Sequence, residues 1–162
     1  MIAVIEKEPY SPALHAEIMP LAQKCWQEST IIKADSCAFY GERDFDIEPF
    51  IEAYEGLNSK GVLVVITLRV DGALEGFIEG FSYRAMHHSK IVGGIADSIY
   101  IEPKYRSYTG VLIERFEGEM SKLGVGIIGW PTQKDGPVYN VLVAKGYVGD
   151  DIVMEKRIRQ CA

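Results

Sequence analysis

The segment SIYIEPKYR, Ser98 to Arg106, decides the fold, because an apolar run ends there at a proline and a cation follows. The run extends back to Val92, so a long strand is predicted over Val92 to Ile101. After a single glycine, Gly110, a helical pattern of apolar residues continues to near Gly124. A helix start next to an arginine is suited to bind an anion, because backbone N–H groups and the helix dipole converge there.

An antiparallel group of strands is predicted immediately before this segment. Val62 to Val70 is rich in β-branched residues, Asp71-Gly72 is a turn signal, and Ala73 to Arg84 is a second strand candidate. A connection at Met86 to Ser89 leads into the strand that begins at Val92. The sequence therefore predicts a three-stranded meander.

The N-terminal third predicts one strand and two helices. Met1 to Ile5 is a short apolar strand, and Ser11-Pro12 supplies a cap and first turn for a helix that Pro20 should kink or divide. Residues 29–45 lack a clear period and are predicted as loop. A second helix is predicted near Asp46 to Tyr54.

Strand and helix alternate in the C-terminal part. We expect a strand over Val125 to Trp130, a helix over Pro137 to Lys145 that ends at Gly146, and a strand over Tyr147 to Ile158. Together with the meander, this order predicts a mixed α/β sheet in one domain that spans residues 1–162.

Composition excludes several classes of function. A net charge of −6 and a pI near 5.1 oppose binding to nucleic acid. No apolar run approaches the ~20 residues of a membrane helix, and no leader is recognisable, so we expect a cytoplasmic protein. Cys25, Cys37 and Cys161 are widely spaced, which favours reduced thiols and predicts no metal site.

The order of elements and three local motifs resemble the GNAT superfamily of N-acetyltransferases over nearly the whole chain. The motifs are SIYIEPKYR, VLVAKGY at Val141 to Tyr147, and MEKRI at Met154 to Ile158. The resemblance implies an α/β (α+β) fold with a mixed, mostly antiparallel, twisted sheet flanked by about four helices.

The resemblance also implies a site for acetyl-CoA. Main-chain N–H groups of Ile99, Tyr100 and Ile101 would polarise the thioester, and Arg106 would face the diphosphate. The turn after Arg106 departs from the family's glycine-rich pattern and is best aligned as two residues shorter. Its amides would come from Ser107, Tyr108, Thr109, Gly110 and Val111.

Two residues are candidates for proton transfer. The family usually has a tyrosine that protonates the leaving thiolate, and the matching position here is Leu142. Tyr139, one turn earlier on the same helix face, is therefore the candidate proton donor. Half-buried packing is the alternative role of Tyr139. Asp97 is the only carboxylate in the strand before Ile101. It is either the base, paired, or exposed to water.

The acceptor is predicted only by its charge. Acidic residues crowd the second helix, and such a field would attract a cationic amine, although a solvated face is the alternative. They are Glu42, Asp44, Asp46, Glu48, Glu52 and Glu55. His87 and His88 are either exposed or on the substrate side, and Trp130 either lines a cofactor channel or fills the core.

Three hypotheses follow from these patterns. The first is an acetyl-CoA-dependent N-acetyltransferase in which a primary amine attacks the thioester directly. The second is a catalytically inactive GNAT-like module that binds protein partners in an assembly, suggested by Leu142 and the missing glycines. The third is an unrelated α/β binding fold. A homodimer remains open in each case.

Overall fold

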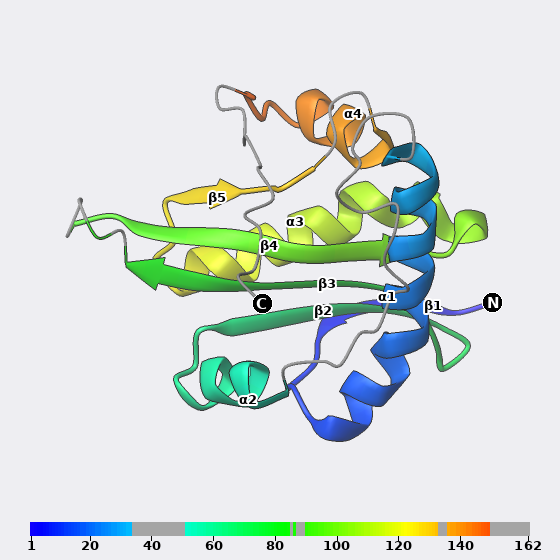
Figure 1. Ribbon diagram of the computed structural model, residues 1–162, viewed down its shortest axis with the longest axis horizontal. Coiled ribbons are helices and arrows are strands. Elements are labelled where there is room, and N and C mark those ends of the chain that lie inside the picture. The colour runs from blue at the N-terminus through cyan, green and yellow to red at the C-terminus, as the bar shows by residue number, and fades with distance from the viewer. Residues whose placement is uncertain (34–50, 85, 87–89, 133–135, 150–162) are drawn as a thin grey trace, which may run out of the picture.

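The computed structural model describes residues 1–33, 51–84, 86, 90–132 and 136–149 (Figure 1). These residues form a sheet and its covering helices. In chain order the elements are β1 (Ala3–Lys7), α1 (Pro12–Lys33), α2 (Ile51–Ser59), β2 (Leu63–Val70), β3 (Ala73–Arg84), β4 (Val92–Ile101), the 3-10 helix η1 (Pro103–Tyr108), α3 (Thr109–Lys122), β5 (Ile127–Gly129) and α4 (Pro137–Ala144).

The sheet has five strands in the order β1-β2-β3-β4-β5. Neighbours are antiparallel except for β4 and β5, which are parallel. The two-residue turn between β2 and β3 has φ of 49° at Asp71 and 88° at Gly72, the left-handed geometry that Asp-Gly favours in hairpins. The predicted meander and the mixed sheet are therefore confirmed.

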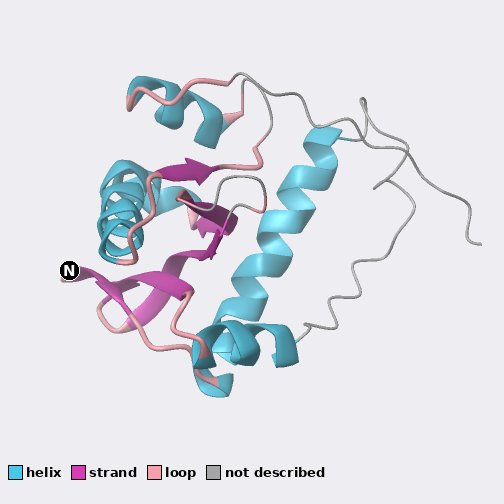
Figure 2. Cartoon of the chain, turned by 90° about the vertical axis from the view of Figure 1, so that its left-hand side faces the viewer, coloured by secondary structure: helices cyan, strands magenta, loops and turns pink. Residues whose placement is uncertain are grey.

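Each face of the sheet is covered by helices. Figure 2 shows α1 on one side of the sheet and α3 on the other. The α3 side is packed around Phe116 and Ile78, both fully buried, and the α1 side around Ile18 and Phe77. Burial on both faces explains why β2 reads as a continuous apolar run rather than an alternating one.

Helix α1 is longer than the sequence predicts. Its start is as expected, since the Ser11 hydroxyl accepts a hydrogen bond of 3.1 Å from the Leu14 N–H. The helix continues through Pro20 to Lys33, so of the two predicted effects of Pro20, a kink or a division, the division does not occur. The loop predicted from residue 29 is wrong up to residue 33. Tertiary contacts of its C-terminal half with β4, described below, stabilise this extension. The rest of the predicted loop lies outside the described residues.

Helix α2 is shifted relative to its prediction. It contains Tyr54 but continues to Ser59, beyond the predicted end, while the predicted start at Asp46 lies outside the described residues. Among the described residues, no helix combines the length and apolar character needed to cross a membrane.

The C-terminal elements are shorter than predicted. Strand β5 covers only Ile127–Gly129, and α4 ends one residue early, at Ala144. Residues 147–149 are not a strand, which corrects the start of the predicted last strand; the remainder of that strand lies outside the described part of the chain. Tyr147 is held differently, because its N–H bonds to Leu142 and its hydroxyl donates to Glu117 of α3 at 2.6 Å.

Candidate functional site

Strand β4 is unpaired along part of the side that faces β5. Its pairing with β5 runs only from Gly93 with Ile127 to Ile95 with Gly129, whereas β4 continues to Ile101 (Figure 1). Within the described residues, positions 96–101 of β4 therefore have β3 on one side and no strand on the other. This segment contains the three residues whose backbone was predicted to polarise a thioester. An unpaired strand edge offers N–H and C=O groups to an extended ligand.

A β-bulge interrupts β4 at the predicted base. Glu79 of β3 pairs with Ser98 and Gly80 pairs with Ala96, which leaves Asp97 between them without a partner. Bulges redirect side chains and are frequent next to active sites. Asp97 is exposed, and its Oδ2 accepts a hydrogen bond of 3.4 Å from the hydroxyl of Tyr54 on α2. The predicted base is thus exposed and also hydrogen-bonded.

Sequence reasoning missed a second carboxylate, Glu79. Its side chain is only 3% exposed, and its Oε1 has no hydrogen-bond partner among the described residues. Burial, and then the negative charge of Asp97, raise the pKa of this carboxyl group from 4.5 to about 7. The signal was present, because Glu79, next to Ile78 and Gly80, is a charge in the middle of a strand as Asp97 is.

Three aromatic rings pack beside the two carboxylates. The ring of Tyr54 stacks on Tyr10 with centroids 5.7 Å apart and lies 5.4 Å from the ring of His15. The Tyr10 hydroxyl and both His15 nitrogens are buried without partners in the described part of the chain. Burial lowers the pKa of His15, and burial together with Glu79 raises the pKa of Tyr54. Within the residues that the structure describes, the surroundings of Glu79 are therefore polar and carry no positive charge.

The predicted phosphate turn is helical. Ser107 and Tyr108 belong to η1, and the 3-10 helix runs directly into α3 at Thr109. The Thr109 N–H donates to the Arg106 carbonyl, and the Thr109 hydroxyl donates to the same oxygen at 2.6 Å. Gly110 lies in the first turn of α3 with helical backbone, and a Cβ there would meet only the Lys145 side chain at 3.7 Å. Gly110 therefore leaves space at this position, but the helical backbone does not require a glycine here.

Arg106 is already paired with a carboxylate. One of its guanidinium nitrogens lies 2.5 Å from Glu28 of α1, and its Nε donates to the Ile101 carbonyl at 3.3 Å. Glu28 also accepts a hydrogen bond of 3.0 Å from the Tyr100 hydroxyl, and burial with this bond raises the pKa of Tyr100 to about 12. A Lys24–Glu102 ion pair lies beside them. Hydrogen bonds and ion pairs thus join the C-terminal half of α1 to the end of β4 and the start of η1.

The predicted acid is separate from the predicted base. Tyr139 is half-buried on α4, where a Cβ on Gly149 would lie 3.9 Å from its ring. Helix α4 packs on the α3 side of the sheet through the buried Leu142, whereas the partner of Asp97 is on α2. No contact between Tyr139 and Asp97 occurs among the described residues.

Other predicted site residues are less informative. Trp130 is partly buried and packs against the core, with its ring 5.6 Å from Phe116 and 6.0 Å from Tyr147, which favours its core role over a channel lining. The predicted histidines His87 and His88 lie outside the described residues, as do the first four acidic residues; Glu52 and Glu55 are exposed on α2. No cluster in the described residues has three side chains able to ligate a metal.

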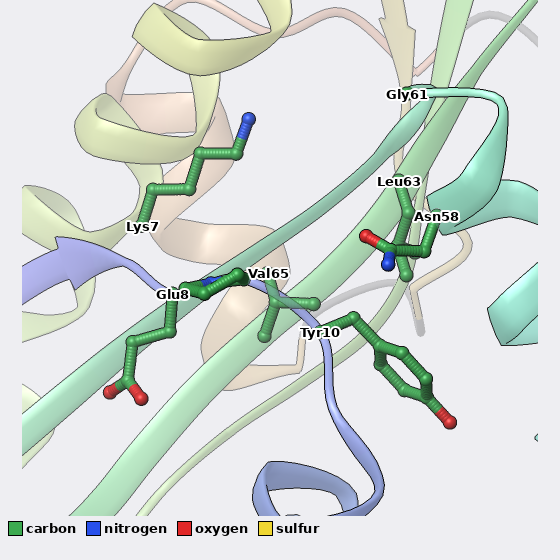
Figure 3. Close-up of a pocket in the computed structure, with 8 residues that line it drawn as sticks. Lys7, Glu8, Tyr10, Asn58, Gly61, Leu63 and Val65 are labelled. Carbon is green, nitrogen blue, oxygen red and sulfur yellow. The ribbon is translucent and has the colours of Figure 1, made fainter.

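A surface pocket of about 210 Å³ lies at the β1 side of the sheet, away from β4. In Figure 3 the side chains of Lys7, Glu8 and Tyr10 point in different directions around it. The Glu8 carboxylate is neutralised by Arg69 at 2.6 Å and bonded to Thr67 at 2.6 Å. Among the described residues that line this pocket, none belongs to β4.

Comparison with known proteins gives matches in structure alone. The chain matches no family model, and no curated protein matches its sequence. AAC(6')-Iy, solved with the bisubstrate analogue CoA-S-monomethyl-acetylneamine, superposes with a TM-score of 0.68 at 13% identity and covers 99% of this chain and 100% of its own.

Two further structures extend the comparison. The ribosomal-protein-alanine N-acetyltransferase from Brucella melitensis biovar Abortus 2308 has a TM-score of 0.64 at 15% identity, with 98% and 100% of the two chains covered. A predicted acetyltransferase from Clostridium acetobutylicum, solved with acetyl-CoA, has a TM-score of 0.66 at 13% identity and covers 96% of each chain. At such identity the likeness establishes architecture rather than activity. The chain has the fold of the GNAT N-acetyltransferases.

Proposed function

We propose that this protein is an acetyl-CoA-dependent N-acetyltransferase in which a primary amine attacks the thioester directly. The observation that carries the proposal is the open edge of β4, which runs from the bulge at Asp97 to Ile101 and is followed by Arg106 in η1. An extended thioester arm along this edge would have its carbonyl near the bulge and its phosphates near the arginine. The fold shared with structures that hold CoA or acetyl-CoA supports this placement.

The open edge would supply binding and polarisation. The pantetheine arm carries amide groups that can hydrogen-bond to strand backbone as an added strand does. Backbone N–H groups of Ile99, Tyr100 and Ile101 are the candidates for stabilising the oxyanion, because preorganised donors aimed at developing charge lower the barrier most. Side-chain identity matters little for this role, so it tolerates a divergent sequence.

Arg106 and the turn after it would bind the diphosphate. Guanidinium groups form strong, charge-assisted hydrogen bonds with phosphate oxygens. Ser107, Tyr108, Thr109, Gly110 and Val111 remain the proposed backbone donors, although the Thr109 N–H is bonded within the chain. For Arg106 to reach a phosphate, its ion pair with Glu28 must open or be shared. The phosphate would then replace one carboxylate partner with a more highly charged one.

The carboxylates at the bulge would bind the acceptor. An amine is protonated at neutral pH, so it is attracted to Asp97 and Glu79 and must lose a proton before it attacks. The exposed acidic residues of α2, Glu52 and Glu55, extend the same negative field. We therefore propose a cationic primary amine as acceptor. Tyr139 is the proposed donor to the leaving thiolate.

Acetyl transfer to defined amines tests the proposal. Purified protein is incubated with acetyl-CoA and either neamine or a peptide with an N-terminal alanine, which correspond to the analogue bound by AAC(6')-Iy and to the ribosomal-protein-alanine N-acetyltransferase. Release of CoA thiol and the mass of the product are measured together. We expect acetylated amine with at least one acceptor class, and a loss of rate in Arg106→Ala through a higher KM for acetyl-CoA. Absence of CoA binding at millimolar concentration contradicts the proposal.

A non-catalytic binding module is the second candidate. The helical turn at Ser107 and Tyr108 and the Arg106–Glu28 pair favour it, because both occupy groups that a diphosphate needs. A module of this kind would retain the fold without binding CoA. Calorimetric titration with CoA separates the two candidates, since heat of binding that disappears in Arg106→Ala is expected only for the cofactor-dependent protein.

A further inference from the structure

The two carboxylates at the β4 bulge have different surroundings, and an inference that rests on the proposed function follows from that difference. Glu79 and Asp97 come from neighbouring strands, and the pairing of Glu79 with Ser98 makes Asp97 its neighbour along β4. Asp97 is exposed and hydrogen-bonded to Tyr54, whereas Glu79 is buried with one oxygen unpartnered in the described part of the chain. Similar groups in unlike surroundings suit different tasks.

Among the described residues, no cation compensates the charge of Glu79. The groups that face it are Asp97 from β4, Tyr54 from α2 and Tyr10 from the β1–α1 connection, with His15 of α1 packed against both tyrosines. Burial lowers the pKa of His15, so that its ring is neutral near pH 7. The β2 residue paired with Glu79 is apolar, Val65 in mid-strand. A buried carboxyl group in this setting takes up a proton readily.

We propose that Glu79 is the group that accepts the proton lost by the acceptor's ammonium ion, while Asp97, held by Tyr54, is a positioning residue that binds the ammonium form. The geometry assigns these roles because Asp97 is exposed to solvent, whereas Glu79 is buried and neighbours Asp97 at the bulge. The pKa of Glu79, about 7, lies near neutral pH, where a general base is most effective.

The proton balance is simple. The ammonium ion transfers one proton to the Glu79 carboxylate, directly or through one water molecule, and becomes a neutral amine. The amine nitrogen then bonds to the thioester carbon and the carbon–sulfur bond breaks. The CoA thiolate takes a proton from the proposed donor Tyr139, and the second amine proton restores the Tyr139 hydroxyl. Glu79 returns its proton to solvent past Asp97 before the next turnover.

Rate profiles against pH test the assignment. For acetyl transfer to neamine or to the alanine peptide, we expect kcat/KM in the native protein to fall below an apparent pKa near 7. Glu79→Gln should lower the rate roughly 10²–10⁴-fold and abolish the fall of kcat/KM at low pH. Asp97→Asn should raise the KM for the amine. It should also shift the fall of kcat/KM to lower pH, because it removes the charge that opposes ionisation of Glu79. Glu6→Gln, an exposed strand carboxylate, is the matched control and should leave the profile unchanged.

A readout without turnover guards against misfolded variants. In ¹³C-carboxyl NMR of glutamate-labelled protein, one resonance should titrate near pH 7, vanish in Glu79→Gln, and titrate at lower pH in Asp97→Asn. Titration of Glu79 near pH 4.5 overturns the inference. So does acetyl transfer with an unaltered profile in Glu79→Gln, which would leave the proposed function standing. Failure of every acceptor with native protein overturns the proposed function and the base role together.

Discussion

The buried carboxyl group of Glu79 should make the stability of the protein depend on pH. Its pKa is about 7 in the folded chain against an ordinary value of 4.5. The folded state therefore binds this proton more tightly than the unfolded state, and the stability that it contributes is present below pH 4.5 and lost as the pH rises to 7. The interval, 7 minus 4.5, corresponds to about 3 kcal/mol at roughly 1.4 kcal/mol per pH unit.

Glu79→Gln removes the titration and keeps the shape of the side chain. Relative to native protein, its free energy of unfolding should rise by about 3 kcal/mol between pH 4.5 and pH 8. Urea denaturation followed by circular dichroism at several pH values measures the difference, in which contributions of other groups such as His15 cancel. Glu6→Gln should stay parallel to native protein. A difference between Glu79→Gln and native protein that is the same at every pH refutes the reasoning.

Three further changes test other parts of the structure. Glu28→Gln should bind CoA several-fold more tightly in calorimetry, because Arg106 is released from its ion pair; weaker binding would mean that Glu28 positions the arginine. Gly80→Ala should destabilise the fold by several kcal/mol in thermal melts, since its Cβ would lie 2.3 Å from a backbone oxygen of β4. Gly56→Ala, whose Cβ would have no atom within 4 Å, should stabilise α2 by up to about 1 kcal/mol. Equal effects of the two substitutions would contradict the packing. Ser11→Ala should cost about 1 kcal/mol through loss of the α1 cap, and an unchanged melting temperature would exclude that role.

The fold was predictable where local signals and burial agree. The bounds of β3 and β4 match their predictions, because the Asp71-Gly72 turn and β-branched runs specify a hairpin without help from distant residues. Helix α1 was predicted too short, because its last turns depend on contacts between Glu28 and β4 that no local pattern reveals. Proline at position 20 suggested a break, yet packing against the sheet kept the helix continuous.

The site was predictable only in part. Asp97 stands out in sequence as the only carboxylate of its strand, and Arg106 stands out through the SIYIEPKYR motif. Glu79 escaped attention because its importance comes from burial and from the bulge that sets Asp97 beside it. Tyr54 and Glu28 are close to those residues only in three dimensions. Sequence patterns thus located the strand that carries the site, while tertiary packing selected the partners of its charges.

Binding of CoA to the open edge of β4 is the central claim, and backbone NMR tests it most directly. Titration of ¹⁵N-labelled protein with CoA should perturb the amide resonances of residues 96–101 and of Arg106 through Val111. The amides of β1, at the opposite edge of the sheet, should stay unchanged. Resonances that remain fixed along β4 at millimolar CoA, or that move only along β1, would contradict the account.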